Sequence, residues 1–287
     1  MNVNIKNFIE QELDYFQPML DRAKKATPKQ RKAWAMETVR ERHARISKEI
    51  HIKCSGKIQH GPFQGMALSA DTWWSKYDLG AQCLGIYEYE ILVELEVLLE
   101  GQNKTFIDIG AADGYYAVGA LFSGLCGKVI CFEQSEAGRT TIRDNWKANG
   151  AHGSLIVQGE ANNESLSALK ESDVNNAVVL IDVEGAEFDI LTEPVLEKLK
   201  RCVVILEVHN WAEDFVSRYT GLLQRLHAYF DIEKIDRKTV DLYSFSELRD
   251  LTDDNRALLG SERRPCAMRF LKLLPRGGSS IDIQSSY

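Results

Sequence analysis

Several features are scarce or missing in this chain of 287 residues, and each absence argues against a kind of site or a class of protein. Its six cysteines are scattered without a Cys-x-x-Cys pair, which leaves little support for a zinc or thiol redox motif. No apolar run approaches the roughly 18 residues that a membrane span needs. The first residues also lack the long apolar core of a signal peptide. These absences predict a reduced, cytoplasmic globular protein without a membrane span.

The charge of the chain is unevenly distributed. Hydrophobic residues make up 44% and charged residues 27%, as in soluble proteins with one large domain or two modest ones. The net charge is −7, yet residues 22–48 hold ten Lys or Arg against Glu37 and Glu41, so this segment is +8 and the remainder −15. A basic segment can contact nucleic acid, an anionic glycan or a membrane surface. A solvated helical face is the simpler interpretation and is favoured.

The first part of the chain is predicted to form helices and a short hairpin. Thr27-Pro28-Lys29-Gln30 is typical of a helix start, with Thr27 as the N-cap and Gln30 completing a capping box. The expected elements are helices over residues 4–24, 28–50 and 79–99 and a hairpin over residues 51–68. We expect residues 1–85 to form an extension that carries either the site for an acceptor substrate or a docking surface for a partner.

From Lys104 onward strand and helix patterns alternate, which predicts an α/β fold with a doubly wound, mostly parallel sheet. The expected strands span residues 105–109, 128–133, 154–158, 177–182, 203–209, 231–235 and 266–274. The expected helices span residues 113–124, 135–149, 211–229 and 246–259. We therefore predict one domain over residues 86–275, followed by a flexible tail over residues 276–287.

The most informative stretch is Phe106-Ile-Asp-Ile-Gly-Ala-Ala-Asp-Gly-Tyr-Tyr116. A strand passes here through a glycine-containing turn into a helix, so free backbone N–H groups and the positive end of the helix dipole point outward. Gly110 lacks a Cβ and lets a ligand lie against the backbone. The next strand ends in Glu133, where a carboxylate can hold a ribose diol.

This loop is not the Gly-x-Gly-x-x-Gly motif of dinucleotide-binding proteins. Ala112 occupies the position of a middle glycine, and Asp113 follows it. Asp108 and Asp113 would repel a pyrophosphate, whereas they suit a cationic sulfonium nucleoside. The loop therefore favours S-adenosylmethionine over NAD, against the simpler alternative of an ordinary strand–turn–helix corner.

Acids also follow the other strands, and ligands of parallel sheets bind beyond these carboxyl ends. The residues found there are Asp108, Glu133, Glu160, Asp182 with Glu184 and Glu187, and Glu207 followed by His209. Helix capping accounts well for Glu187. It accounts poorly for Asp182 and Glu207, which adjoin apolar strands, because a buried acid needs a partner. The series predicts a binding edge for a cationic and hydroxyl-rich ligand.

A second motif, Val178-Val-Leu-Ile-Asp-Val-Glu-Gly-Ala-Glu-Phe188, carries a resemblance to a known family. Residues 86–275 resemble FkbM-type methyltransferases, a branch of the class I S-adenosylmethionine-dependent enzymes, which implies a Rossmann-like sheet. The residues that carry the resemblance are 106–114, Phe132-Glu133, Asn145, Asn149, Ile181-Asp-Val-Glu-Gly-Ala-Glu187 and Ile205-Leu-Glu-Val-His209. Gln134-Ser135 departs from the family, which often has proline after the acid.

The resemblance also implies roles for individual residues. Glu133 would bind the ribose hydroxyls, Glu160 would meet the adenine edge, and Asp182 would face the sulfonium and the acceptor. The residues that would line the methionine and ribose part of the cofactor are Asp108, Gly110, Ala111, Asp113 and Gly114.

Methyl transfer to a sugar hydroxyl benefits from a general base, which is worth roughly 10²–10⁴-fold in rate. The candidates are His209 and Asp182, followed by Glu184. An unperturbed histidine, with a pKa of about 6.5, suits this task near neutral pH, although a structural role for His209 weighs equally. The leading prediction involves no metal; in an alternative, Asp182, Glu184 and His209 hold a divalent ion that binds two acceptor hydroxyls.

The leading prediction is therefore an O-methyltransferase that acts on a glycan or small-molecule acceptor, with oligomerisation left open. A second candidate is a nucleic-acid or protein methyltransferase that uses the basic segment 22–48, although the Asn-Pro-Pro-Tyr-like run typical of base amino-nitrogen methylation is absent. A third is a non-catalytic binding protein that retains the fold, against which the intact series Asp108, Glu133 and Asp182 argues.

Overall fold

The computed structural model describes residues 14, 17, 18, 21, 22, 24–74, 76–100, 102–262 and 269–276. The chain divides into two compact units, one formed by residues 1–89 with 238–263 and the other by residues 90–237 with 264–287. Most of the helix predicted over residues 4–24, and all of the predicted tail beyond residue 276, lie outside the described residues. None of the described helices combines the length with the apolar character that a bilayer crossing requires.

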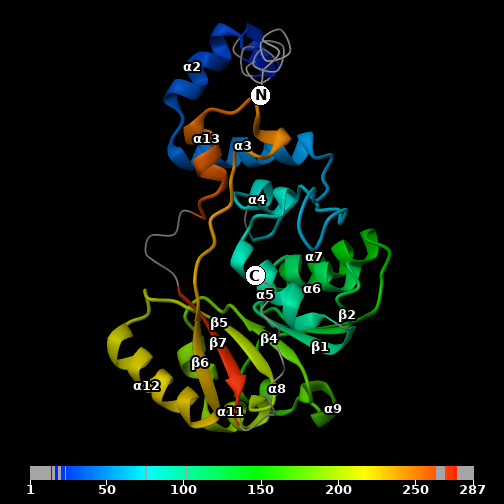
Figure 1. Cartoon of the computed structure of the whole chain (residues 1–287), viewed down its shortest axis with the longest axis vertical. Coiled ribbons are helices and arrows are strands. Elements are labelled where there is room, and N and C mark those ends of the chain that lie inside the picture. The colour runs from blue at the N-terminus through cyan, green and yellow to red at the C-terminus, as the bar shows by residue number, and fades with distance from the viewer. Residues whose placement is uncertain are drawn as a thin grey trace, which may run out of the picture. The chain divides into compact units, whose positions relative to one another are not determined.

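The first unit is built from short helices (Figure 1). They are α2 (Pro28–Met36), α3 (Val39–Lys53), α4 (Leu79–Leu84), the 3-10 turn η1 (Ser246–Leu248) and α13 (Asp253–Leu259). The single helix predicted over residues 28–50 is wrong: Thr38 is extended and starts α3 with a second capping box to Glu41. In place of the predicted hairpin, the structure has turns and an isolated antiparallel bridge between Lys57 and Ala67.

The helix predicted over residues 79–99 is also divided in two. Gly85 ends α4 in the left-handed conformation, with a φ of +72°. A Cβ at this position would lie 2.0 Å from the carbonyl oxygen of His60, so a glycine is required there. The chain resumes as α5 (Tyr89–Leu99), which leads into the second unit.

Residues 238–263 belong to the first unit, which differs from the continuous domain predicted over residues 86–275. Within this unit α13 packs against α3. Asp250 pairs with Arg22 at 3.2 Å and with Lys53 at 2.6 Å. These contacts join residues that are far apart in the chain, so local sequence patterns give no signal for them.

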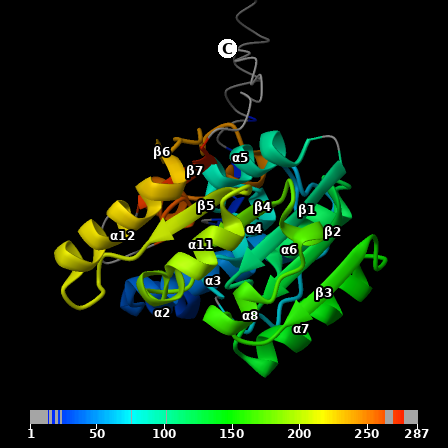
Figure 2. The ribbon, with the colours of Figure 1, turned by 90° about the horizontal axis from the view of Figure 1, so that it is seen from below.

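The second unit contains a seven-stranded sheet in the order β3-β2-β1-β4-β5-β7-β6, which can be followed across Figure 2. The strands are β1 (Gln102–Ile109), β2 (Cys126–Phe132), β3 (Ser154–Gln158), β4 (Val178–Ile181), β5 (Val203–Val208), β6 (Phe230–Ile235) and β7 (Arg269–Pro275). The first five pair in parallel, and β7 lies antiparallel between β5 and β6. The predicted α/β fold with a mostly parallel sheet is confirmed.

Helices cover both faces of this sheet. They are α5, α6 (Tyr115–Phe122), α7 (Glu136–Ala148), α8 (Asn163–Ser167), α9 (Glu171–Val174), α10 (Glu187–Ile190), α11 (Glu193–Leu199) and α12 (Phe215–Tyr229). α6 packs against β1, β2 and α7, whereas α11 packs against α8, α9 and α12. One buried cluster joins Ile109, Ile181 and Leu206 of the strands to leucines of α11 and α12.

The alternation of side chains along the strands brings several acids to the opposite face. Neighbouring residues of a strand point to opposite faces. Because Ile109, Ile181 and Leu206 face α11 and α12, Asp108 and Glu207 face the other way. The register pairs Asp108 with Leu180 and Ile181 with Leu206, so the ends of β1, β4 and β5 meet at one edge. The acids of separate strands therefore converge there.

Cys131 of β2 and Cys202, which precedes β5, are buried thiols. Burial raises the pKa of the Cys202 thiol to about 12 and that of Cys131 well above its ordinary value. A thiol whose thiolate is disfavoured in this way is a poor nucleophile, so both cysteines act as small packing residues.

Candidate active site

The loop Gly110–Gly114 connects β1 to α6 and lies against the ends of two neighbouring strands. The N–H groups of Gly110 and Ala111 donate to the carbonyl of Phe132 at 2.9 and 3.0 Å. Gly110 has a φ of +95°, and a Cβ there would lie 1.7 Å from the carbonyl oxygen of Asp182. Glycine is therefore required for the loop to approach the end of β4.

Ala112 occupies the loop position where a glycine is missing. Its φ is +48°, a left-handed conformation that alanine adopts at a cost of roughly 1 kcal/mol. The N–H of Ala112 donates to Oε2 of Glu133 at 2.9 Å. This hydrogen bond to a charged group helps to hold the strained backbone in place.

Glu133 follows β2 and links the loop to the start of α7. Its Oε2 accepts from Ala112, and its Oε1 accepts from the N–H of Ser135 at 2.7 Å. Burial raises the pKa of Glu133, although these two hydrogen bonds and the charge of Arg139 oppose the shift. A carboxylate oxygen has more than one acceptor position, so Glu133 can also accept from the hydroxyls of a ribose.

Two residues of α7 support the loop from behind. A Cβ on Gly138 would lie 2.7 Å from Cγ of Glu133, and Asn145 donates to the carbonyl of Asp113 at 2.9 Å. The family resemblance includes Asn145, whereas the need for Gly138 was missed. A glycine in the first turn of a helix is the sequence signal that could have identified it.

Asp108 lies at the end of β1 and is 2% exposed. Burial raises its pKa to about 8, the charges of Asp182 and Glu133 add to this shift, and a hydrogen bond from the N–H of Ala117 opposes it. At neutral pH Asp108 is therefore mostly protonated in the absence of a cation.

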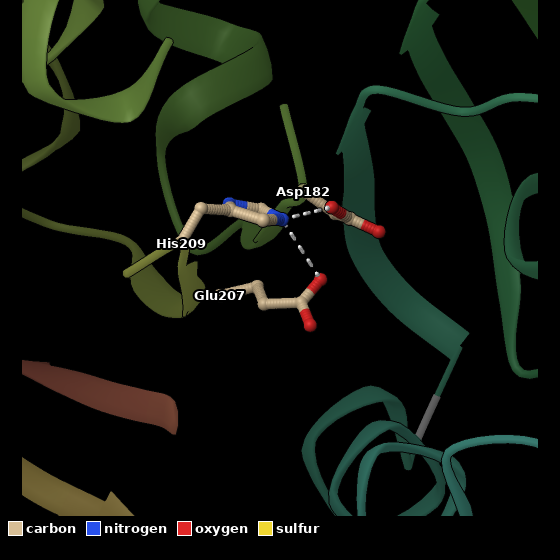
Figure 3. Close-up of side chains that lie close together, drawn as sticks. All are labelled: Asp182, Glu207 and His209. Carbon is tan, nitrogen blue, oxygen red and sulfur yellow. Dashed lines mark ion pairs between the residues drawn. The ribbon is translucent and has the colours of Figure 1, made fainter. Parts of the chain in front are cut away.

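Carboxylates surround the imidazole of His209 on its Nε2 side (Figure 3). Nε2 lies 3.3 Å from Oδ1 of Asp182, 3.6 Å from Oε2 of Glu207 and 3.8 Å from Oε2 of Glu184. The side chains of His209 and Glu207 are fully buried, whereas that of Glu184 is 43% exposed. The predicted catalytic residues Asp182, Glu184 and His209 thus come together, and Glu207 joins them.

Glu187 holds the other side of the same imidazole. Its Oε1 lies 3.2 Å from Nδ1 of His209 and accepts from the His209 N–H at 2.8 Å. Its Oε2 accepts from the N–H of Gly185 at 2.9 Å. The sequence favoured a helix-capping role for Glu187. Glu187 does begin α10, but it is fully buried and also contacts His209. It fixes the orientation of His209.

The charge state of His209 follows from these neighbours. Burial alone would lower the pKa of His209, but the carboxylates of Asp182 and Glu187 outweigh it and raise the pKa to about 9. With this pKa the imidazole carries a proton at neutral pH. His209 can therefore accept a proton only after a neighbouring negative charge is neutralised, which leaves the carboxylates of Asp182 and Glu184 as the other candidate bases.

The solvent side of this cluster is formed by a strained turn and an aromatic residue. Glu184 and Gly185 have φ values of +54° and +104°. The ring of Trp211 lies 4.8 Å from that of His209 between centroids, and Trp211 is 43% exposed. Left-handed backbone at Glu184 is the kind of strain that occurs at functional sites. Trp211 was missed, because a lone aromatic after a strand carries no distinctive pattern.

Glu160 is the predicted site residue farthest from this cluster in the sheet order. It follows β3, is exposed, and its carbonyl accepts from the hydroxyl of Ser165 at 3.2 Å. β2 and β1 separate β3 from β4, so the end of β2 with Glu133 lies between Glu160 and the His209 cluster. Contact of Glu160 with an adenine edge stays a prediction.

No family model and no curated protein sequence matches the chain. A precorrin-6y C5,15-methyltransferase from Geobacter metallireducens is similar in structure, with 20% identity, coverage of 52% of this chain and 74% of that chain, and a TM-score of 0.38. M. jannaschii TYW2 in complex with AdoMet has 15% identity, coverage of 71% and 78%, and a TM-score of 0.42. The B. subtilis tRNA methyltransferase TrmK has 15% identity, coverage of 62% and 63%, and a TM-score of 0.37. Likenesses this weak carry no argument about function.

Proposed function

We propose that this protein is an S-adenosylmethionine-dependent methyltransferase of FkbM-like type, which methylates a hydroxyl group of a sugar, glycan or similar acceptor. The observation that carries the proposal is the row of acids along one edge of the sheet. Glu133 is fixed beside the Gly110–Gly114 loop, and Asp108 and Asp182 follow on the adjacent strand ends.

The sheet topology supports a nucleoside site at this edge. The chain proceeds from β1 through β2 to β3 on one side of β1, and the connection from β3 to β4 then crosses to the other side. Such a switch point is where open α/β sheets bind their ligands. Glu133 suits ribose hydroxyls, and the bare backbone at Gly110 allows close approach.

The charge of the edge favours one class of nucleoside cofactor. Asp113 lies in the loop and Asp182 lies next to it, so a pyrophosphate would bring further negative charge there, and Asp108 would have to stay protonated beside it. A sulfonium carries a positive charge and would be stabilised by the same acids. The residues present therefore fit S-adenosylmethionine better than NAD.

The residues around His209 can support the transfer itself. When bound, S-adenosylmethionine supplies an activated methyl group: a C–O bond forms to the acceptor, the sulfur keeps the electrons of the broken C–S bond, and the hydroxyl proton leaves. Asp182 and Glu184 are the carboxylates that can take this proton. His209 lies 3.3 Å from Asp182 as an ion-pair partner, and Glu187 keeps His209 in position.

The surroundings favour a hydroxyl-rich acceptor over a polyanion. Carboxylates accept hydrogen bonds from hydroxyl groups, and the exposed face of Trp211 suits stacking against a sugar ring. Nucleic acid would be repelled by these carboxylates. In the basic segment 22–48, Arg22 and Arg45 are already paired with Glu49 and Glu37, both at 2.6 Å.

Transfer of a labelled methyl group tests this proposal. We would incubate the protein with methyl-labelled S-adenosylmethionine and separate pools of oligosaccharides and RNA. The wild type should label a carbohydrate, and Asp182→Asn should lower the rate by roughly 10²–10⁴-fold, the usual effect of losing a general base. Asp189→Asn is the matched control, because Asp189 is an exposed acid of α10 that pairs with Arg218 at 2.6 Å.

The outcomes separate the candidates. Labelling of RNA in place of carbohydrate would favour the nucleic-acid methyltransferase. Equal rates in Asp182→Asn and Asp189→Asn would contradict the role of Asp182. Binding of S-adenosylmethionine with no labelling of any pool would favour a non-catalytic binding protein.

A further inference from the structure

We propose that Asp182, Glu207 and His209 bind a first-row divalent metal ion, with Mn²⁺ as the best match, that positions the acceptor hydroxyl for methylation. The role of the ion in methylation rests on the proposed function, whereas its binding can be measured independently. The residues lie at the ends of β4 and β5, on the face of the sheet opposite α11 and α12.

The spacing of the ligand atoms fits a shared ion. The nearest ligand atoms of the three side chains all lie within 4.8 Å of one another. Nε2 of His209 is 3.3 Å from Oδ1 of Asp182 and 3.6 Å from Oε2 of Glu207. Bonds of roughly 2.1 Å to a metal place neighbouring ligand atoms about 3.0 to 3.4 Å apart, so only small shifts are required.

The hydrogen bonding of His209 gives a second, independent indication. Among the described residues, its Nε2 is buried and makes no hydrogen bond of acceptable geometry, although Asp182 lies 3.3 Å away. The imidazole is fully buried and directed at two carboxylates (Figure 3). A buried nitrogen aimed at a gap between carboxylate oxygens is the arrangement of a histidine ligand.

The orientation of the imidazole agrees with the same assignment. Nδ1 of His209 faces Glu187 at 3.2 Å, so when a metal ion displaces the proton of Nε2, the proton on Nδ1 stays with Glu187 and the lone pair of Nε2 is directed at Asp182 and Glu207. Histidine ligands usually donate their other N–H to a carboxylate in this way, which fixes the tautomer and strengthens the ligand. Glu187 is itself anchored by the N–H groups of Gly185 and His209.

The chemistry of the three ligands limits which metal ions can bind. One imidazole and two carboxylates, without a thiolate, suit Mn²⁺, Fe²⁺ or Zn²⁺ better than Mg²⁺ or a soft ion. The two negative charges would neutralise a divalent ion in this buried position. Glu184, which is half-exposed and 3.8 Å from Nε2, lies on the side from which an acceptor would reach the ion. A hydroxyl on the ion would lose its proton more easily, and Glu184 would take this proton while Asp182 is bound to the ion.

The site differs from the metal alternative drawn from the sequence. That alternative used Asp182, Glu184 and His209, because all three follow strand ends. In the structure Glu207 is closer to Nε2 than Glu184 is, at 3.6 against 3.8 Å, and it is fully buried. The alternation of side chains along β5 places Glu207 on the same face as Asp108.

Titration with Mn²⁺ alone tests the site. We would remove metals from the full-length protein with a chelator and follow free Mn²⁺ by electron paramagnetic resonance, with Zn²⁺ in a parallel calorimetric titration. The wild type should bind one ion per chain. Glu207→Gln should weaken binding at least 10-fold, and Glu187→Gln should weaken it by about 10–100-fold through the orientation of His209.

Two controls keep the result interpretable. Asp189→Asn removes an exposed acid from α10 and should leave Mn²⁺ affinity unchanged. S-adenosylmethionine binding and thermal melting, measured for every variant, show whether a loss of Mn²⁺ affinity reflects misfolding. If Glu207→Gln fails to fold, Glu187→Gln, which removes no direct ligand, still tests the site.

The outcomes distinguish this inference from the proposed function. Failure of the wild type to bind Mn²⁺ or Zn²⁺, or binding that both Glu207→Gln and Glu187→Gln leave intact, would overturn the metal site. If Mn²⁺ binds there but S-adenosylmethionine does not bind, the metal site stands and the proposed function fails. If Mn²⁺ binds there but methyl transfer is as fast in excess chelator, the proposed function stands and the role of the ion in positioning the acceptor is overturned.

Discussion

At the scale of single residues, two acids at neighbouring strand ends are held in different environments. Glu133 receives two backbone N–H groups and sits near Arg139, which stabilises its ionised form against the effect of burial. Asp108 is almost fully buried and faces the charges of Asp182 and Glu133. The structure therefore holds Glu133 by two backbone hydrogen bonds at the proposed ribose site, and it keeps Asp108 largely protonated near the end of β1.

Asp108 should make the apo protein less stable as the pH rises. The pKa of Asp108 is raised to about 8 in the folded state, against about 3.9 when unfolded. Between these values the folded state holds a proton that the unfolded state releases, so the free energy of unfolding falls as pH increases. Asp108→Asn removes this dependence and should be more stable than wild type at pH 8, by up to about 5 kcal/mol.

Thermal melts of both proteins at pH 5 and pH 8, without ligands, would measure this effect. A gain of 1 kcal/mol corresponds to roughly 2–4 °C in Tm for a chain of this size class. The gain in Tm of Asp108→Asn over wild type should be smaller at pH 5 than at pH 8. In a separate titration, the substitution should lower the affinity for S-adenosylmethionine. An advantage that is equal at both pH values, or absent at pH 8, would show that Asp108 does not carry this charge effect.

The partners of buried acids were only partly predictable from the sequence. The apolar strands before Asp182 and Glu207 indicated that both acids need a partner, and His209 lies close to each of them. The role of Glu187 was not predictable, because a first-turn acid has the same local pattern whether it caps a helix or is buried. Only the tertiary fold brings Glu187 against a histidine one strand away.

At the scale of elements, the strands of the sheet were the most predictable part of the fold. The strands predicted over residues 105–109, 177–182 and 203–209 lie within three residues of β1, β4 and β5 at either end. Central parallel strands are buried on both faces, so they form continuous apolar runs that are easy to recognise. Helix breaks were missed, because a cap at Thr38 and a left-handed Gly85 depend on one residue each.

The ion pair between Lys272 of β7 and Glu94 of α5 could not be predicted from the apolar pattern of the strand. Lys272 interrupts an apolar strand, is 8% exposed, and donates to Glu94 of α5 at 2.9 Å. Lys272→Ala should lower the free energy of unfolding by about 1–3 kcal/mol, because it leaves a carboxylate without its charged donor. Lys234→Ala on β6 is the control and should change it by less than about 0.5 kcal/mol, since Lys234 is exposed.

Urea denaturation of the wild type and the two variants would measure these differences. The midpoint should shift for Lys272→Ala with little change in the slope. Equal effects of the two substitutions would mean that the pair with Glu94 contributes no more than a surface contact.

At the scale of the whole molecule, the candidate active site and the basic segment belong to different units. The sheet unit holds the loop after β1, Glu133 and the cluster of carboxylates around His209. The other unit holds the basic segment 22–48, where salt bridges to Glu37, Glu49 and Asp250 neutralise part of the charge. Residues 238–263 join this unit through long-range contacts, which is why the domain boundary could not be predicted from the order of elements alone.

Calorimetric titration of the 287-residue chain would show directly whether the sheet unit binds S-adenosylmethionine through Glu133. S-adenosylmethionine and S-adenosylhomocysteine should bind, and NAD should not. Glu133→Gln should weaken both by about 10–150-fold, the loss of a hydrogen bond to a charged group. Glu164→Gln, an exposed acid in the first turn of α8, should bind like wild type. Failure of both sulfur nucleosides to bind, or tighter binding of NAD, would show that this edge of the sheet is not a site for S-adenosylmethionine.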